Sequence, residues 1–350
     1  MEVDAKRLEE FMHHAVADLG AAASAALVLI GDRLGLYRAL AKGAATPAEL
    51  ARRTGTAERY VREWLGNQLA GGYVSFHSGS GSYYLTPEQA MAMAQEDSPV
   101  FLPGAFQILQ AMWKAEGRIE QNFRTGEGLP WTEQDHSLFE GTERFFRPGY
   151  AAHITQDWIP ALDGVKEKLE AGARVADVGC GHGASTVILA KAFPRSRFTG
   201  FDFHPESIET ARKRAAAAKV GDRVEFQVAP ATEYPGKDYD LVTHFDCLHD
   251  LPDPVGAGRR ARESLARDGT WMIVEPAAGD RTTDNVNPVS RVFYAASTMI
   301  CVPNALAFSE EALGAQAGEA RIAKVARDAG FGSFRRATET PFNMVFEARA

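Results

Sequence analysis

A group of glycines and carboxylates near the middle of the chain has the types and spacing of a nucleotide-type binding turn. Residues 174–183 begin as an apolar run, which predicts a strand, and continue directly into a glycine-rich turn. Residues 183–193 are rich in Ala, Val, Ile and Leu and predict a helix. Glycines let backbone approach a ligand closely, and a helix N-terminus offers free N–H groups and a positive dipole end. The unit therefore predicts a site for a nucleotide-like ligand.

The spacing of the glycines in this turn limits the kind of ligand that it can bind. Gly179, Gly181 and Gly183 follow a Gly-x-Gly-x-Gly pattern, and Asp177 lies two residues before the first of them. A carboxylate there repels a pyrophosphate but suits a ligand with an ammonium or sulfonium group. Residues 197–202 predict a second strand that ends in Asp202, about 20 residues further on, where an acid binds ribose hydroxyls.

Together these residues resemble motif I and the following acidic motif of class I S-adenosylmethionine-dependent methyltransferases. The resemblance implies S-adenosylmethionine as methyl donor and S-adenosylhomocysteine as product. After the third strand the family often has Gly-Asp-Ala, whose acid contacts the adenine amine, whereas residues 229–232 read Ala-Pro-Ala-Thr. Backbone near Ala231 and the hydroxyl of Thr232 are expected to replace that acid. The positions assigned to the donor on these grounds are Asp177, Gly179, Gly181, Gly183, Asp202, Phe203, Ala231 and Thr232.

A histidine after the fourth predicted strand is the candidate base. Residues 249–253 resemble the His-Asp-Trp/Leu-x-Asp signature of winged-helix O-methyltransferases, in which the histidine is the base, and the match falls on His249. An acceptor hydroxyl needs a base to take its proton, and a histidine has a suitable pKa. The alternative is a structural hydrogen bond at a strand–helix junction. Phe245 and Asp246 lie where this fold places residues beneath the donor's methionine part, so Asp246 either holds the ammonium group or caps the following turn.

The N-terminal part predicts a winged helix. Residues 5–42 are helical in pattern, and residues 46–69 predict two further helices. Thr46 is the expected N-cap of the first, with a capping box to Glu49, and Thr56 is the expected cap of the second. Residues 73–76 and 82–85 predict a hairpin. Residues 28–90 hold seven Lys/Arg and five Asp/Glu, a surplus too thin for contacts to DNA phosphates. The segment resembles the winged-helix dimerisation domain of small-molecule O-methyltransferases from plants and bacterial natural-product pathways, which implies a homodimer formed through the N-terminal domain.

Composition limits the remaining function classes. The 350 residues are 45% hydrophobic and 24% charged, with a formal charge of −8, which argues against a general nucleic-acid binder. Three widely spaced cysteines fit a reducing cytoplasm. The start of the chain lacks a signal-peptide pattern, and the apolar run at residues 21–30 is too short to span a membrane. No His/carboxylate pair has metal-ligand spacing, so we expect no metal.

From residue 171 the chain alternates predicted strands and helices, as a doubly wound sheet requires. The fold class is therefore α/β: a seven-stranded Rossmann-like methyltransferase sheet, with strand 7 antiparallel, preceded in sequence by a mainly α N-terminal winged-helix domain. We expect three parts: residues 1–95 as dimerisation domain, 96–170 as helical connector and 171–350 as donor-binding domain. Within the aromatic connector, residues 124–130 and 147–150 predict loops. The connector and the insert at residues 277–307 are expected to shape the acceptor pocket.

The sequence thus predicts a cytoplasmic enzyme that transfers a methyl group from S-adenosylmethionine to a small-molecule acceptor, in the first place a hydroxyl. Three alternatives stay open. The acceptor is carbon or nitrogen in some relatives, and a few relatives use a metal. In the third, the chain is a winged-helix transcriptional regulator that senses S-adenosylmethionine.

Overall fold

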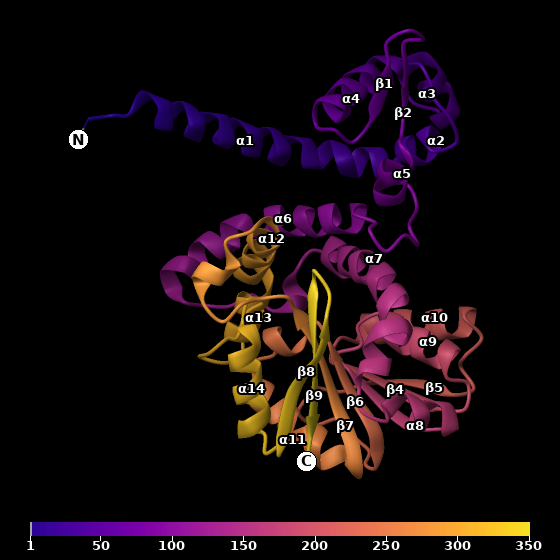
Figure 1. Cartoon of the computed structure of the whole chain (residues 1–350), viewed down its shortest axis with the longest axis vertical. Helices are drawn as coiled ribbons and strands as arrows, with labels where there is room; N and C mark the ends of the chain where they lie inside the picture. The colour runs from indigo at the N-terminus through magenta and orange to yellow at the C-terminus, as the bar shows by residue number, and fades with distance from the viewer. Residues whose placement is uncertain (1) are drawn as a thin grey trace. The chain divides into compact units, whose positions relative to one another are not determined.

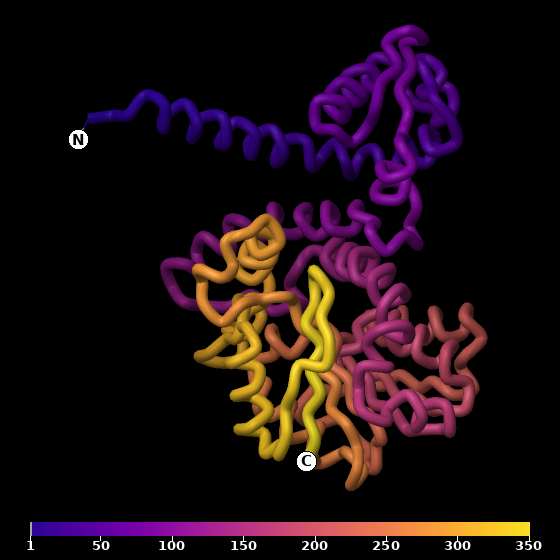
Figure 2. The backbone as a smooth tube through the Cα atoms, in the orientation of Figure 1, coloured from indigo at the N-terminus to yellow at the C-terminus, as the bar shows by residue number. Residues whose placement is uncertain are grey.

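The structure is a computed structural model that describes residues 2–350, and its chain forms two compact units (Figures 1 and 2). The first unit contains the residues up to 110 together with residues 140–148, and the second contains residues 111–139 and 149–350. Helices α6 (Pro103–Thr125) and α7 (His136–His153) contribute residues to both units. The segment expected as a connector, residues 96–170, is therefore divided between the two.

The first unit contains the winged helix that the sequence predicts. Its elements are α1 (Ala5–Arg33), α2 (Leu36–Leu40), α3 (Pro47–Thr54), α4 (Glu58–Ala70), β1 (Ser75–His77), β2 (Ser82–Tyr84) and α5 (Pro87–Met93). The single helical stretch expected over residues 5–42 is broken at Gly35, whose φ of +70° is a left-handed conformation that favours glycine. Thr46 and Glu49 form the predicted capping box of α3. Thr56 does not cap the next helix, because its hydroxyl bonds to that of Thr54 and α4 starts after Ala57.

One apolar core holds the winged helix together. Tyr37 of α2 and Trp64 of α4 pack edge to face with ring centroids 5.0 Å apart, beside buried Leu50 of α3. The Tyr37 hydroxyl is hydrogen-bonded to buried Gln68. A buried polar group without a partner is costly, so this bond lets the tyrosine fill the core.

Helix α1 is the least buried part of this unit. Its C-terminal half buries Val28 and Leu29, but its N-terminal half exposes an apolar stripe at helical spacing. The stripe consists of Leu8, Phe11, Met12, Val16 and Leu19. By length and composition alone α1 is also apolar enough to cross a membrane. Residues 21–30 are too short to indicate this, but a longer window through the alanines reaches that hydropathy.

The second unit is built on a seven-stranded sheet in the order β5-β4-β3-β6-β7-β9-β8. The five strands β3 to β7 run parallel, and β9 is antiparallel to its neighbours β7 and β8. The sheet confirms the predicted fold class, including the antiparallel seventh strand. The strands are β3 (Arg174–Val178), β4 (Arg197–Asp202), β5 (Val224–Val228), β6 (Tyr239–Phe245), β7 (Leu265–Pro276), β8 (Ser333–Glu339) and β9 (Asn343–Arg349).

Helices cover both faces of this sheet (Figure 1). Those on one face are α8 (Val165–Ala171), α9 (Ala184–Ala192) and α10 (Pro205–Ala217), and those on the other are α11 (Pro254–Ser264) and α14 (Gly318–Asp328). Trp271 of β7 and Phe346 of β9 are fully buried beside Ile322 of α14. Such coverage explains why the strands read as apolar runs rather than as alternating patterns.

The remaining helices of the second unit connect or interrupt this pattern. The insert after β7 forms α12 (Pro288–Ala296), a π-helical turn η6 (Ser297–Cys301) and α13 (Val302–Leu306). Residues 147–150, which the sequence indicates as a loop, lie within α7. Pro148 is tolerated there inside the helix, although proline removes one backbone N–H. Short turns complete the unit: η1 (Trp131–Glu133), η2 (Ile154–Trp158), η3 (Ile159–Ala161), η4 (Leu248–Asp250) and η5 (Thr282–Asn285).

Candidate active site

The glycine turn between β3 and α9 has one open position and two packed ones. Gly179, Gly181 and Gly183 all have positive φ, between 51° and 74°. A Cβ on Gly179 would lie 2.6 Å from Cys247 Sγ, and one on Gly183 would lie 2.6 Å from the ring of Phe226. A Cβ on Gly181 would meet no heavy atom within 4 Å. Only Gly181 therefore borders open space, where a ligand can approach the backbone closely.

Asp202 at the end of β4 is tied to this turn. Its Oδ2 accepts a hydrogen bond from the Gly181 N–H at 2.8 Å, and its Oδ1 accepts from the His204 N–H at 2.9 Å. Burial raises the pKa of Asp202, while the backbone N–H groups oppose that rise. The carboxylate is thus held at the open glycine, as a group that binds ribose hydroxyls must be.

Asp177 is occupied by the protein itself. Its side chain is buried and accepts hydrogen bonds from Ser185 Oγ at 2.7 Å, Thr186 Oγ1 at 2.5 Å and Thr243 Oγ1 at 3.0 Å. These bonds join β3 to β6 and to the first turn of α9. Three hydroxyl groups already satisfy the Asp177 carboxylate, which leaves it little capacity for a ligand. Its direct contact with a ligand's ammonium group stays a prediction.

Asp246, directly after β6, sits in a similar framework. Tyr150 donates its hydroxyl to Oδ2 at 2.7 Å, and Asn343 donates its amide to Oδ1 at 2.7 Å. Burial raises the pKa of Asp246 to about 7. The residue has φ +49°, a left-handed conformation that Asp tolerates better than most side chains. Neighbouring Phe245 is buried against Tyr150 and Trp158.

The candidate base lies in turn η4, which follows β6. His249 Nδ1 is 2.6 Å from Oε2 of Glu275 on β7, and both side chains are buried. Glu275 Oε1 also accepts from the Leu248 N–H at 3.0 Å, which fixes the carboxylate. Burial lowers the pKa of His249, but the negative charge of Glu275 and hydrogen bonds to Glu275 and Cys301 together outweigh it, and the net pKa lies well above the ordinary value.

Asp250, next to the base, anchors a second aromatic residue. Trp131 donates its indole N–H to Asp250 Oδ2 at 2.9 Å. Asn304 of α13 donates to the Asp250 carbonyl at 2.8 Å and accepts from the Trp131 N–H at 3.0 Å. Burial raises the pKa of Asp250 to about 6. Phe139 lies edge to face with Trp131, with ring centroids 5.6 Å apart.

The other predicted donor contacts lie on the turns that follow β4 and β5. Phe203 follows Asp202 directly and is exposed, while Ala231 and Thr232 are half-buried in the turn after β5. That turn is joined to the β4 end because the Ala229 N–H donates to the Asp202 carbonyl at 3.0 Å. The turns after β3, β4 and β5 and the η4 turn all leave the carboxyl ends of parallel strands, and this edge is where ligands bind in open α/β sheets.

Sequence reasoning did not identify Glu275, Tyr150 or Asn343 as site residues. Glu275 carries a signal that could have been used, since it is an acid near the end of an otherwise apolar buried strand. Tyr150 and Asn343 reach Asp246 from positions 96 and 97 residues away in sequence, and nothing local marks them. Among residues 2–350 no group of three or more His, Cys, Asp or Glu is arranged to hold a metal ion.

Comparison with known proteins identifies the two units. Residues 22–95 match the family model of the Rv2258c-like winged HTH domain, and residues 169–325 match the family model of the methyltransferase domain. The chain joins a winged helix to a class I methyltransferase domain. The residues matched by the methyltransferase model include all the site residues described above except Trp131, Phe139, Tyr150, Trp158 and Asn343.

Individual relatives agree with this assignment. A trans-aconitate 2-methyltransferase of Streptomyces avermitilis is 31% identical over 132 residues, which are 37% of this chain and 49% of that protein. The chain spans about half the length of the curated relatives it matches, with 48%, 49% and 58% covered in three of them. Each of these matches covers less than half of this chain, with 37%, 35% and 43% in the same three relatives.

Two solved structures share the fold along nearly the whole chain. The mitomycin 7-O-methyltransferase MmcR has a TM-score of 0.72 at 20% identity, with 99% of this chain and 100% of that chain covered. Human N-acetylserotonin methyltransferase, solved in complex with S-adenosylmethionine, has a TM-score of 0.70 at 18% identity, with 99% and 98% covered. At these identities the likeness concerns the fold, a winged helix followed by a methyltransferase domain.

Proposed function

We propose that the methyltransferase domain binds S-adenosylmethionine at the Gly181–Asp202 edge and transfers its methyl group to a hydroxyl of a small molecule, with His249 as base. The observation that supports this most directly is the buried His249–Glu275 pair at the same sheet edge as the open glycine turn. Bound S-adenosylmethionine would supply an activated methyl group on a sulfonium. The chain's own residues then need to bind, orient and remove one proton.

The residues fit the donor in shape and in charge. Gly181 leaves room for close backbone approach, and Asp202 is fixed beside it as an acceptor for ribose hydroxyls. Asp246 directly follows β6, which pairs with β3. An ammonium group bound there would give its buried carboxylate a counter-charge. The buried acids Asp177 and Asp202 add negative potential near the turn, which favours a positively charged ligand over a neutral one.

His249 is arranged to take a proton through Nε2. With Glu275 as the acceptor for Nδ1–H, the neutral ring has its lone pair on Nε2. The buried thiol of Cys301 is also hydrogen-bonded to His249, so it competes with an acceptor hydroxyl for the ring. The raised pKa of His249 makes the ring a stronger base and favours its protonated form. A cationic donor bound nearby opposes that protonation and lowers the pKa of His249. The base is therefore best prepared for catalysis when the donor site is filled.

Calorimetry and a turnover assay together test this proposal. We expect S-adenosylmethionine and S-adenosylhomocysteine to bind the wild-type protein and the His249→Ala variant with similar affinity. The wild-type protein should methylate at least one member of a panel of small hydroxyl compounds, and the His249→Ala variant should not. Absence of binding to folded wild-type protein would refute the donor site. Loss of donor binding in a folded His249→Ala variant would refute the assignment of the base.

Carbon or nitrogen acceptors are the first alternative. A nitrogen acceptor that is already neutral needs no base, so unchanged turnover in His249→Ala would favour it. Metal assistance predicts that a chelator abolishes turnover. The His249–Glu275 pair favours a proton-transferring role, and hence a hydroxyl acceptor, over both.

The regulator alternative meets an electrostatic obstacle in the winged helix. On α4, Arg59 and Arg62 pair with Glu63 and Glu58 one turn away. Arg53 of α3 donates to the carbonyls of Gly43 and Ala44. Glu58 and Glu63 offset the charges of the two α4 arginines and so reduce the positive potential that phosphate binding needs. Duplex binding in a gel-shift assay at physiological salt, without methyl transfer to any acceptor, would favour the regulator instead.

We further propose that the protein is a cytoplasmic homodimer formed through the N-terminal domain. The exposed apolar stripe of α1 supports this, because Phe11 and Leu19 are 65% and 71% exposed in a single chain. The same stripe on a second copy is a self-complementary cover for it. All three cysteines are free thiols, as a reducing compartment allows.

A further inference from the structure

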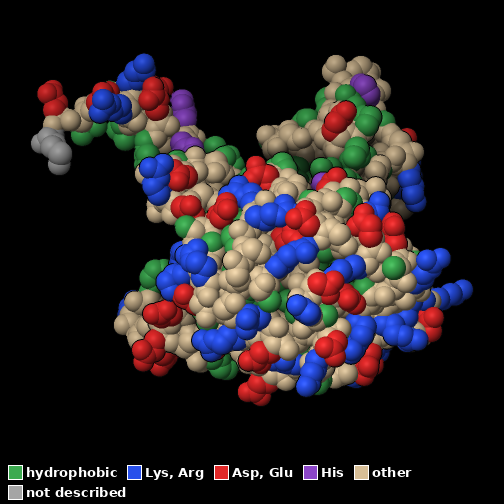
Figure 3. All heavy atoms as spheres, turned by 60° about the horizontal axis from the view of Figure 1, so that its bottom comes forward, with side chains coloured by type: hydrophobic (Ala, Val, Ile, Leu, Met, Phe, Trp, Pro, Cys, Tyr) green, Lys and Arg blue, Asp and Glu red, His purple; other side chains and the backbone are tan. Residues whose placement is uncertain are grey.

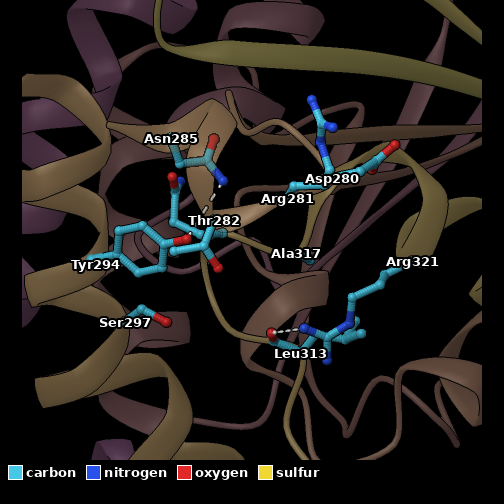
Figure 4. Close-up of a pocket in the computed structure, with 10 residues that line it drawn as sticks. Asp280, Arg281, Thr282, Asn285, Tyr294, Ser297, Leu313, Ala317 and Arg321 are labelled. Carbon is cyan, nitrogen blue, oxygen red and sulfur yellow. Dashed lines mark hydrogen bonds between the residues drawn. The ribbon is translucent and has the colours of Figure 1, made fainter. Parts of the chain in front are cut away.

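A crevice of about 270 Å³ opens between the segment after β7, helix α12 and the segment that leads into α14 (Figure 4). Asn285, Ser297 and Ala317 are buried in it, whereas Asp280 and Arg321 are exposed at its rim. Its lining residues include neither the predicted base nor any predicted donor contact. Its volume lies just below the roughly 300–1,000 Å³ of typical ligand pockets, so an occupant must be small.

Arg321 provides the crevice with an uncompensated cation. Its guanidinium donates to the carbonyls of Leu313 and Ala312, both at 3.0 Å. Carbonyls accept these bonds but carry no net charge. Among residues 2–350 no carboxylate lies within ion-pair distance of Arg321, whereas neighbouring Arg281 is paired with Asp284 at 2.8 Å. Arg321 is therefore the lining residue suited to receive a ligand's carboxylate.

Asp280 provides the opposite charge in a fixed position. Its Oδ1 accepts from the Ala320 N–H at 2.8 Å in the first turn of α14. Gly318, with φ +77°, packs directly beneath it, since a Cβ there would lie 2.6 Å from Oδ1. In the described chain no Lys, Arg or His pairs with Asp280, so its second oxygen can accept from a ligand's ammonium group.

Gln316 adds an acceptor that lacks a partner. Its Nε2 donates to the carbonyls of Ala315 at 3.0 Å and Ala277 at 3.4 Å. Only the NH₂ end of an amide can face two carbonyls, so its orientation is settled. Oε1 is then left buried with no hydrogen bond from any described residue. Gln316 lines the crevice, so a donor bound there could supply the hydrogen bond that this oxygen lacks.

We propose that this crevice binds a small amino acid in its zwitterionic form. Its carboxylate binds Arg321, and its ammonium group binds Asp280 and Gln316. In Figure 4, Asp280 and Arg321 lie on one side of the crevice, and Asn285, Tyr294 and Ser297 lie on the other. An arginine and a carboxylate that line one crevice, neither of them in an ion pair with another described residue, suit a molecule that carries both charges. The leucine and alanine in the lining, Leu313 and Ala317, offer an apolar surface for a short side chain.

Three isosteric probes test the proposal on the full-length protein. At the carbon next to the carboxylate, L-alanine carries an ammonium group, L-lactate carries a hydroxyl, and propionate carries neither. Binding is measured by saturation-transfer NMR titration with S-adenosylhomocysteine present, so that alanine does not enter the site of the donor's amino-acid part. We expect alanine to bind with a dissociation constant of roughly 1–10 mM. Lactate should bind more weakly and propionate most weakly.

Two charge variants and one matched control complete the test. Arg321→Gln and Asp280→Asn should each weaken alanine binding about tenfold, the effect of losing one partly exposed charge partner. Lys324→Gln on the same helix removes a cation that pairs with Asp328 outside the crevice and should change nothing. Unchanged binding in Arg321→Gln, binding of propionate equal to that of alanine, or no alanine binding up to about 50 mM would each overturn the proposal. Lactate binding as tightly as alanine would overturn the role of Asp280. Thermal unfolding of each variant shows that it is folded.

Discussion

Gly181 donates its backbone N–H to Asp202 Oδ2 at 2.8 Å, and this bond joins the glycine turn after β3 to the end of β4. Gly181 also borders open space, so one residue both positions the carboxylate and leaves room beside it. The two predicted halves of the donor site are thereby one physical unit. Changes to either half should affect the same binding reaction.

Replacement of Asp202 by Asn should weaken binding of S-adenosylhomocysteine without unfolding the domain. Asn keeps one acceptor for the Gly181 N–H but loses the charge that strengthens hydrogen bonds to ribose hydroxyls. We expect a loss of about 1.5–3 kcal/mol, measured by calorimetry. Asp222→Asn is the control, since Asp222 is exposed and pairs only with adjacent Arg223. Equal affinity in Asp202→Asn and wild type would remove Asp202 from the donor site.

Alanine at His249 should lower kcat about 10²–10⁴-fold, the usual contribution of a general base, and leave donor affinity unchanged. Single-turnover kinetics with saturating donor separate the chemical step from binding. Glu275→Gln should lower kcat less, since the histidine remains and Gln retains an acceptor for one of the two donors, the Leu248 N–H or the ring N–H. A larger defect in Glu275→Gln than in His249→Ala would instead make Glu275 the more important group.

The pH dependence of kcat should rise with pH, because only the neutral ring of His249 can accept a proton. The pKa of His249 is raised above its ordinary value, chiefly through the charge of Glu275 acting against burial. The midpoint of the profile in wild type should therefore lie above the roughly 6.5 of free histidine. Removal of that charge in Glu275→Gln should move the midpoint to lower pH. A midpoint that stays in place would show that another group controls the profile.

Asp246 should make the folded state less stable as pH rises from about 4 to about 7. Burial raises its pKa to about 7 in the folded state from 3.8. In that window the folded protein binds more protons than the unfolded chain, so the free energy of unfolding falls with increasing pH. Asp246→Asn keeps acceptor and donor atoms for Tyr150 and Asn343 but does not titrate. Denaturant unfolding at pH 5 and pH 8 should show a decrease of a few kcal/mol in wild type and a smaller decrease in the variant, in which Asp250 and His249 still titrate.

Glutamate on the apolar stripe of α1 should convert the proposed dimer into a monomer. Phe11→Glu replaces a side chain that contributes roughly 1.5–3 kcal/mol when buried with a charge that is costly to bury. Sedimentation velocity at micromolar concentration measures the change, and Glu9→Gln on the same helix is the matched control. Wild-type protein that sediments as a monomer would contradict the proposal, as would a Phe11→Glu variant that remains dimeric.

The sequence by itself determined the fold class, the strand–turn–helix unit and the winged helix. Each depends on local signals: apolar runs for β3 and β6, the glycine spacing after β3, and the capping box at Thr46 and Glu49. Such signals lie within a few residues of one another and need no knowledge of distant contacts. They also placed Asp202 and His249 near strand ends, which meet at one edge of a parallel sheet.

Only the tertiary structure decided what surrounds those residues. It shows Asp177 held by three hydroxyls, and Glu275 of β7 paired with His249 of turn η4. Tyr150 and Asn343 reach Asp246 from nearly 100 residues away in either direction. Partners of this kind are chosen by packing and by the cost of leaving buried polar groups unpaired, and neither is encoded in local spacing. The helix at residues 147–150 has the same cause, because tertiary contacts outweighed the local preference of Pro and Gly for a turn.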